Sequence, residues 1–196
     1  IRTRRSVRTF TGAPLDPGHV GLLKEIALRA PTSRNLRPWA FVFVEDPEKL
    51  DALSRCKPHG AAFLAGAALG IVVCADEAQS DVWVEDGSVA SILLQFAAQS
   101  LGLGSCWLQV RQRKTAAGAS AEDHVRQVLG LPDGLRVEVV GAVEEEAATS
   151  AGAYHLVAQH APADWVVIGE PSRWDRITLG YKGRLLVDYR LERALS

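Results

Sequence analysis

Short apolar segments alternate with helical segments along most of this chain, and this alternation limits the fold more than any other feature of the sequence. Apolar runs of strand length, bounded by turn residues, occupy residues 39–44, 69–75, 106–110, 137–143 and 165–169. Strands separated by helices predict a sheet that is covered on both faces. The sequence therefore predicts an α/β or α+β fold of three layers.

Capping signals mark the helical segments. Asp-Pro pairs at residues 16–17 and 46–47 each place an acidic N-cap before a proline at the first helical position, and Pro31 ends the first helix. A Ser-x-x-Asp pattern at residues 120–123 predicts another helix start. Residues 86–101 predict a long helix with little polar face, which must be buried in the core or against another subunit.

Composition predicts one globular domain over residues 1–196. The chain is 47% hydrophobic and 23% charged, with a formal net charge of −1, and it has no broad basic stretch typical of nucleic-acid binding. Its most apolar segment, residues 61–75, is broken by two glycines and is too short to span a membrane. Three widely spaced cysteines in apolar surroundings indicate reduced thiols, so we expect a cytoplasmic protein.

Two basic clusters lie at opposite ends of this nearly neutral chain. Arg4-Arg5-Ser6-Val7-Arg8 is near the start, and Lys182-Gly183-Arg184 is near the end. If the fold brings them together, guanidinium groups, an ammonium group and the Ser6 hydroxyl would converge on an anion such as a phosphate monoester. The first cluster in isolation would more often be a solvated basic end, or a contact to nucleic acid or an acidic membrane.

A glycine pair, Gly102-x-Gly104, follows the predicted long helix and precedes a strand. This order excludes a dinucleotide-binding fingerprint, whose glycines follow a strand and open a helix. Glycines are ordinary in a tight connection of this kind, and they also let a planar ligand approach the backbone. The neighbouring Cys106 is expected to be a packing residue, because no base accompanies it. The five histidines show no metal-ligand pattern, so we expect no metal site.

Several motifs follow one another along most of the chain. They are Arg4-Arg5-Ser6-Val7-Arg8-x-Phe10, Ala30-Pro31-Thr32-Ser33-x-Asn35-x-x-Pro38-Trp39, Trp83-x-x-Asp86-Gly87-Ser88-x-Ala90, Gly102-x-Gly104-Ser105-Cys106-Trp107, Gly169-Glu170-Pro171 and Lys182-x-Arg184-Leu185. In this order they resemble the motifs of the nitroreductase family of FMN-dependent oxidoreductases. The resemblance implies an α+β fold, a three-layer α/β/α sandwich with a central, mostly antiparallel sheet. It also implies a homodimer, for which the helix at residues 86–101 is a candidate interface.

The resemblance further implies which residues bind FMN. The arginines, Ser6 and Lys182 would hold its phosphate, and residues 102–105 would lie against the ring. A flavin bound mainly by the other subunit would be contacted by Pro31, Thr32, Ser33 and Asn35. The complete set is Arg4, Arg5, Ser6, Arg8, Pro31, Thr32, Ser33, Asn35, Gly102, Leu103, Gly104, Ser105, Lys182 and Arg184.

Arg37 and Trp39 would border the substrate pocket. Arg37 stands where the family usually has glutamine, and a fixed cation at the pocket mouth would favour an anionic substrate or product. A surface arginine that pairs with an acid is the alternative.

By the same resemblance, the expected enzyme takes hydride from NADH or NADPH onto FMN. It then passes electrons to nitroaromatics, quinones or similar electron-poor small molecules by a ping-pong mechanism. The flavin would carry the chemistry, so no catalytic side chain is expected. Two alternatives remain: another reduced-flavin reaction of the superfamily, such as dehalogenation, dehydrogenation or flavin breakdown, and a non-catalytic FMN carrier.

Overall fold

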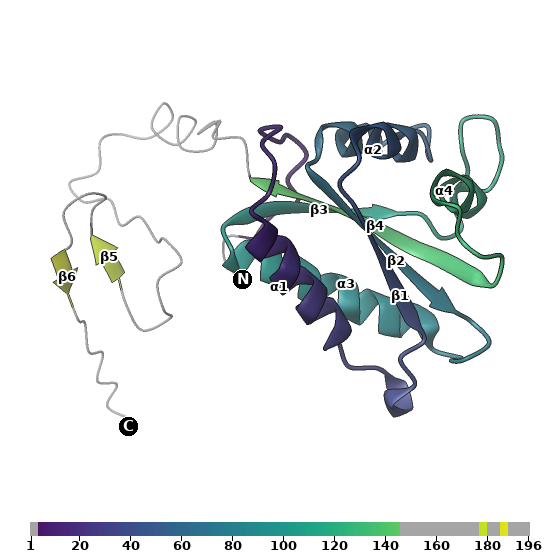
Figure 1. The fold of residues 1–196 in the computed structure, drawn as a ribbon, viewed down its shortest axis with the longest axis horizontal. Coiled ribbons are helices and arrows are strands. Elements are labelled where there is room, and N and C mark those ends of the chain that lie inside the picture. Colours follow the sequence, from purple (N-terminus) through teal and green to yellow (C-terminus); the bar gives the residue numbers. More distant parts are fainter. Residues whose placement is uncertain (1–3, 146–176, 180–184, 188–196) are drawn as a thin grey trace, which may run out of the picture. The chain divides into compact units, whose positions relative to one another are not determined.

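The computed structural model describes residues 4–145, 177–179 and 185–187 (Figure 1). The chain forms two compact units, residues 1–148 and residues 149–196. In the second unit, β5 (Ile177–Leu179) and β6 (Leu185–Val187) form an antiparallel pair. The strand predicted at residues 165–169 lies outside the described residues, and a single domain over residues 1–196 stays a prediction.

The described part of the first unit is built on an antiparallel sheet of four strands in the order β1-β2-β4-β3. The strands are β1 (Trp39–Val44), β2 (Leu69–Asp76), β3 (Leu103–Gln109) and β4 (Leu135–Glu145). Each contains most of a predicted apolar run, which confirms those four predictions and the antiparallel sheet. β3 begins earlier than predicted, because Leu103 and Gly104 already pair with β4.

The described part of this unit also contains four α-helices and two short 3-10 helices, of which the first two precede β1 and the others connect the strands. They are α1 (Pro17–Leu28), η1 (Ser33–Asn35), α2 (Pro47–Ser54), η2 (Ala62–Gly66), α3 (Trp83–Ser100) and α4 (Ala121–Leu129). The predicted N-caps of α1, α2 and α4 are confirmed, since the side chains of Asp16, Asp46 and Ser120 each accept a backbone N–H of the first turn. α3 starts at Trp83 rather than residue 86, without a side-chain cap.

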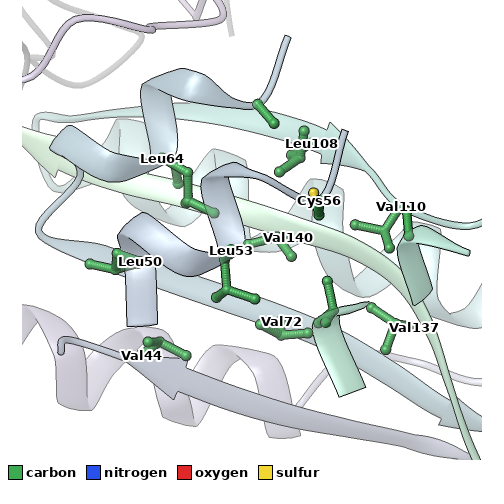
Figure 2. Close-up of a cluster of buried hydrophobic side chains, with 14 of the residues drawn as sticks. Val44, Leu50, Leu53, Cys56, Leu64, Val72, Leu108, Val110, Val137 and Val140 are labelled. Carbon is green, nitrogen blue, oxygen red and sulfur yellow. The ribbon is translucent and has the colours of Figure 1, made fainter. Parts of the chain in front are cut away.

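Side chains that alternate along the strands create two apolar layers. On β2, Ile71 belongs to a cluster with α1 and α3, whereas the next residue, Val72, belongs to a cluster with α2 and α4. Figure 1 shows these helix pairs on opposite faces of the sheet. In Figure 2, Leu50 and Leu53 of α2 lie over Val72 and Val140. Each fully buried leucine stabilises the fold by about 2 kcal/mol. The three-layer prediction is therefore confirmed.

Among the described helices, none combines the length and the apolar composition that crossing a membrane requires.

Candidate functional site

Residues 4–8, here called the arm, run along the outer edge of β3. The N–H of Val7 donates to the carbonyl oxygen of Ser105 at 2.9 Å, and Ser6 forms an isolated parallel bridge with Ser105. A Cβ on Gly104 would lie 3.0 Å from the Val7 side chain, tighter than ordinary contacts. Residue 104 thus lets the arm pack directly on the strand, which fixes the arm beside the start of β3.

Two arginines of the arm, Arg4 and Arg8, carry positive charge that no described carboxylate neutralises. A terminal nitrogen of Arg4 donates to the neutral side-chain oxygen of Gln95 at 3.2 Å, and Arg8 makes no ion pair within the described part of the chain. Both guanidiniums act on the nearby thiol of Cys106: burial raises its pKa, and Arg8 and Arg4 partly oppose that rise. These guanidiniums and the exposed Ser6 hydroxyl are hydrogen-bond donors of the kind that a phosphate group accepts.

Residues 31–37, here called the loop, connect α1 to β1. The N–H of Ser33 donates to Oδ1 of Asp86 at 2.7 Å, and the Ser80 hydroxyl donates to the other carboxylate oxygen of Asp86 at 3.2 Å. Asp86 is only 5% exposed. A buried carboxylate needs such donors, and its charge makes the bond to Ser33 a strong one. Asp86 therefore anchors the loop to the first turn of α3.

Three residues of the loop adopt left-handed backbone conformations. Arg34, Asn35 and Arg37 have φ values of 52°, 56° and 51°. For residues other than glycine this region costs about 1 kcal/mol or more each, so surrounding contacts must hold the chain there. Arg37 supplies two of them: its N–H donates to Thr32 Oγ1 and its Nε to Asn35 Oδ1, both at 3.0 Å. The alternative for Arg37 was a surface arginine paired with an acid. Among the described residues, Arg37 forms no ion pair with an acid.

Trp39 follows the loop as the first residue of β1. Its ring lies 5.1 Å from that of Phe41, between centroids, and it borders a groove of about 480 Å³ along β1 with Lys24 and Leu28 of α1. The buried Nε1 of Trp39 has no hydrogen-bond partner among the described residues.

Within one chain, the arm and the loop lie at opposite ends of the sheet. The loop leads into Trp39, which pairs with the end of β2, whereas Ser105 beside the arm pairs with a β4 residue near the start of β2. Asp86 and Gln95, which hold the loop and the arm, are nine residues apart in α3, or about 14 Å along its axis. The predicted site residues thus form two separate half-sites in one chain.

The predicted glycine segment runs from the exposed Gly102 into the buried start of β3. Gly102 has a φ of 78°, which only glycine adopts easily, and it ends α3. The side chains of Leu103 and Ser105 are buried, at 3% and 4% exposure, so only their backbone groups could meet a ligand. Lys182 and Arg184 lie outside the described residues, as does the motif at residues 169–171.

Asp86 and Gln95, which hold the two half-sites, have no role that the sequence alone predicts. Both are buried polar residues in a helix that is otherwise mostly apolar. Charged and amide side chains are rarely buried unless they have partners. A polar residue within this apolar helix was therefore the one sequence feature that could have pointed to them. Their partners, Ser33 and Arg4, are distant in sequence, and no local pattern points to them.

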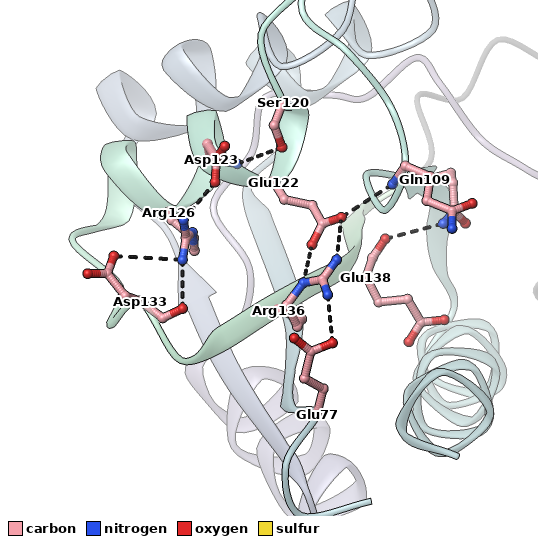
Figure 3. A network of polar contacts seen from close by, with 10 residues as sticks. Glu77, Gln109, Ser120, Glu122, Asp123, Arg126, Asp133, Arg136 and Glu138 are labelled. Atoms are coloured by element: carbon pink, nitrogen blue, oxygen red, sulfur yellow. Dashed lines mark hydrogen bonds and ion pairs between the residues drawn. The ribbon is translucent and has the colours of Figure 1, made fainter. Parts of the chain in front are cut away.

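A second polar cluster, between α4 and β4, is held together by ion pairs among its own members (Figure 3). Arg136 lies between Glu122, at 3.0 Å, and Glu77, at 2.6 Å. The side chain of Glu122 also accepts the N–H of Gln112 at 3.3 Å. These ion pairs and hydrogen bonds join α4 to the sheet. The described residues contain no group of three or more His, Cys, Asp and Glu side chains placed to hold a metal ion.

Comparison with known proteins identifies relatives of this chain. The family model of the nitroreductase family matches residues 1–57, which contain both the arm and the loop. A protein of Archaeoglobus fulgidus, provisionally named NADH dehydrogenase/NAD(P)H nitroreductase, is 36% identical over 141 residues, which cover 70% of this chain and 78% of that protein.

Solved structures show the same fold. An FMN-dependent nitroreductase from Clostridium difficile R20291 superposes with a TM-score of 0.72 at 34% identity, over 84% of this chain and 97% of that one. A protein from Desulfovibrio desulfuricans, provisionally named a nitroreductase and solved in complex with FMN, superposes with a TM-score of 0.62 at 25% identity, over 74% of this chain and 83% of that one.

Proposed function

The chain belongs to the nitroreductase family, and we propose that it is an NAD(P)H-dependent oxidoreductase with FMN as its cofactor. The names of the relatives and the FMN bound in the Desulfovibrio structure support the cofactor and the reductant. One observation in this chain carries the proposal. The arm holds Arg4, Ser6 and Arg8 against β3, and no described carboxylate neutralises the two arginines.

These residues fit the phosphate of FMN. Arg4 and Arg8 would bind its oxygens with charge-assisted hydrogen bonds, and Ser6 would donate a further one. Arg5 belongs to the same motif, and Lys182 and Arg184 are proposed as phosphate ligands from their motif alone. Residues 102–105 would offer backbone groups to the ring. FMN, when bound, supplies the two-electron carrier, and the protein binds, orients and shields it.

We propose a homodimer, because the arm and the loop cannot meet within one chain. A second copy could bring its Pro31, Thr32, Ser33 and Asn35 to a flavin held by the first copy's arm. α3 presents a surface for this pairing: Val89, Ile92 and Phe96 lie on one side of the helix and are 39%, 36% and 37% exposed. A closed pair related by a two-fold axis would contain two equivalent flavin sites.

We propose nitroaromatics, quinones or similar electron-poor small molecules as acceptors, reduced by a ping-pong mechanism. For a quinone, NAD(P)H, a proton and the quinone give NAD(P)⁺ and the quinol. A hydride carries both electrons from the nicotinamide, and solvent supplies the second proton. The chain offers no separate nucleotide-binding fingerprint, so the reductant and the acceptor would use the same flavin face in turn.

Initial rates test this mechanism. We expect double-reciprocal plots against the concentration of NAD(P)H to be parallel at several fixed quinone concentrations, because one product leaves before the second substrate binds. Lines that intersect would show that both substrates bind together, and they would contradict the shared face.

A further inference from the structure

The two arginines of the loop differ in how their charges are compensated. Arg34 forms an ion pair with Asp81. Arg37 contacts only neutral oxygens, those of Thr32 and Asn35, through its N–H and its Nε. Its two terminal nitrogens, Nη1 and Nη2, have no partner among the described residues. Arg37 therefore carries a positive charge that no described acid compensates, on an exposed guanidinium.

Asp76, the acid at the end of the neighbouring strand β2, already accepts hydrogen bonds from its own turn. Asp76 donates its backbone N–H to the carbonyl oxygen of Pro38 at 2.9 Å, which places it next to the end of the loop. Its carboxylate accepts the N–H of Ala78 and the side-chain amide of Gln79, both at 2.9 Å. This carboxylate closes its own turn and makes no ion pair with Arg37.

The loop also holds Arg37 in a defined position. The bond from Ser33 to the buried Asp86 fixes one end of the loop, and the buried Pro38 leads into β1 at the other. Between them, the Nε bond to Asn35 restrains the plane of the Arg37 guanidinium. A preorganised guanidinium loses less conformational entropy when it binds a ligand, and its free nitrogens fit two oxygens of one oxyanion.

We propose that Arg37 is a specificity-determining residue that binds an oxyanion of the substrate through its Nη atoms. This inference rests on the proposed function, in which the loop borders the flavin. The oxyanion has two possible sources of the same chemistry: a carboxylate on the electron acceptor, or the 2′-phosphate that distinguishes NADPH from NADH.

Matched substrates separate these sources in the FMN-loaded enzyme. We would compare 4-nitrobenzoate with 4-nitrobenzamide as acceptors, and NADPH with NADH as reductants, in the wild type, Arg37→Gln and Arg34→Gln. For each pair, kcat/KM for the member that carries the tested oxyanion is divided by kcat/KM for the member that lacks it. This ratio is compared between enzymes, so differences in intrinsic reactivity cancel. Arg37→Gln should lower one ratio at least tenfold, mainly through KM, and the pair affected identifies the source. Arg34→Gln is the matched control, because it removes an arginine whose charge is already compensated, and it should leave both ratios unchanged.

A binding measurement independent of turnover accompanies the kinetics. Titration of benzoate and benzamide into the oxidised enzyme, followed by the flavin absorbance, tests for a carboxylate on the acceptor. Competition of 2′,5′-ADP and 5′-AMP with these ligands tests for the 2′-phosphate of the reductant. Arg37→Gln should selectively weaken binding of benzoate or of 2′,5′-ADP, the members that carry the tested oxyanion. Arg37→Lys should retain part of that binding, since lysine keeps the charge but lacks the planar guanidinium.

Unchanged ratios and unchanged selective binding in Arg37→Gln would overturn the role of Arg37 and leave the flavin enzyme intact. A wild-type protein that takes up no FMN would overturn the proposed function, and this inference with it.

Discussion

Glu138 is a buried carboxyl group whose position explains why residue 87 is a glycine. It is 2% exposed, and a Cβ on Gly87 would lie 1.9 Å from its Oε2. Ser88 donates its hydroxyl to Oε1 at 2.6 Å, while the buried Oε2 has no hydrogen-bond partner within the described residues. Burial raises the pKa of Glu138 to about 7, although the Ser88 bond and the charge of Arg111 lower it; Glu85 adds to the rise.

This pKa predicts a loss of stability with rising pH. The unfolded chain releases the proton near the ordinary value of 4.5, whereas the folded protein keeps it up to about 7. Between these values the folded state binds more protons, so its stability falls as pH rises, by about 3 kcal/mol in total from this residue. Glu138→Gln should remove that fall. Urea unfolding of both proteins at pH 5 and pH 8 measures it, and Glu138→Gln should be the more stable at pH 8.

Glu122→Gln is the matched control. Glu122 is also buried, at 8% exposure, but its carboxylate is paired with Arg136. The substitution removes a charged partner from Arg136 and should destabilise the protein at both pH values. The account of Glu138 fails if Glu138→Gln and Glu122→Gln lose the same stability at pH 8.

At the scale of elements, α3 connects most of the features described above. Its first turns hold the loop through Asp86 and accommodate Glu138, and its later turns hold the arm through Gln95. Its inner face lies against α1 and the sheet, where Leu94 and Ala98 are buried. The apolar stripe of Val89, Ile92 and Phe96 lies on another side and remains partly exposed.

This stripe predicts how the dimer can be disrupted. Ile92→Glu places a charge at the centre of the stripe and should convert the dimer to a monomer, because burying an unpaired carboxylate in an apolar interface is costly. Gln127→Glu adds the same charge to an exposed position of α4, on the other face of the sheet, and should leave the mass unchanged. Light scattering after size-exclusion chromatography measures both. A wild-type monomer, or an Ile92→Glu protein that stays dimeric, would contradict the assignment of α3 as the interface.

At the scale of the whole molecule, the predictable features were those encoded locally. The Asp-Pro helix starts and the apolar strands follow from neighbouring residues, and the structure contains them at the expected places. The start of β3 was not predictable, because Gly104 and Ser105 have weak strand propensity and are held there by β4 and the arm. The half-sites were predicted from a resemblance in motifs. Their separation in one chain depends on strand register, which local patterns do not specify.

The central claim is that this chain is a flavin enzyme reduced by a nicotinamide. The most direct test is the anaerobic visible absorbance spectrum of the FMN-reconstituted protein, before and after addition of NADH or NADPH. The account predicts an oxidised flavin spectrum that bleaches with one of the two reductants. A stable flavin spectrum that neither reductant bleaches would contradict the proposed activity and favour a carrier or another flavin reaction. A protein that remains colourless after reconstitution would contradict the cofactor itself.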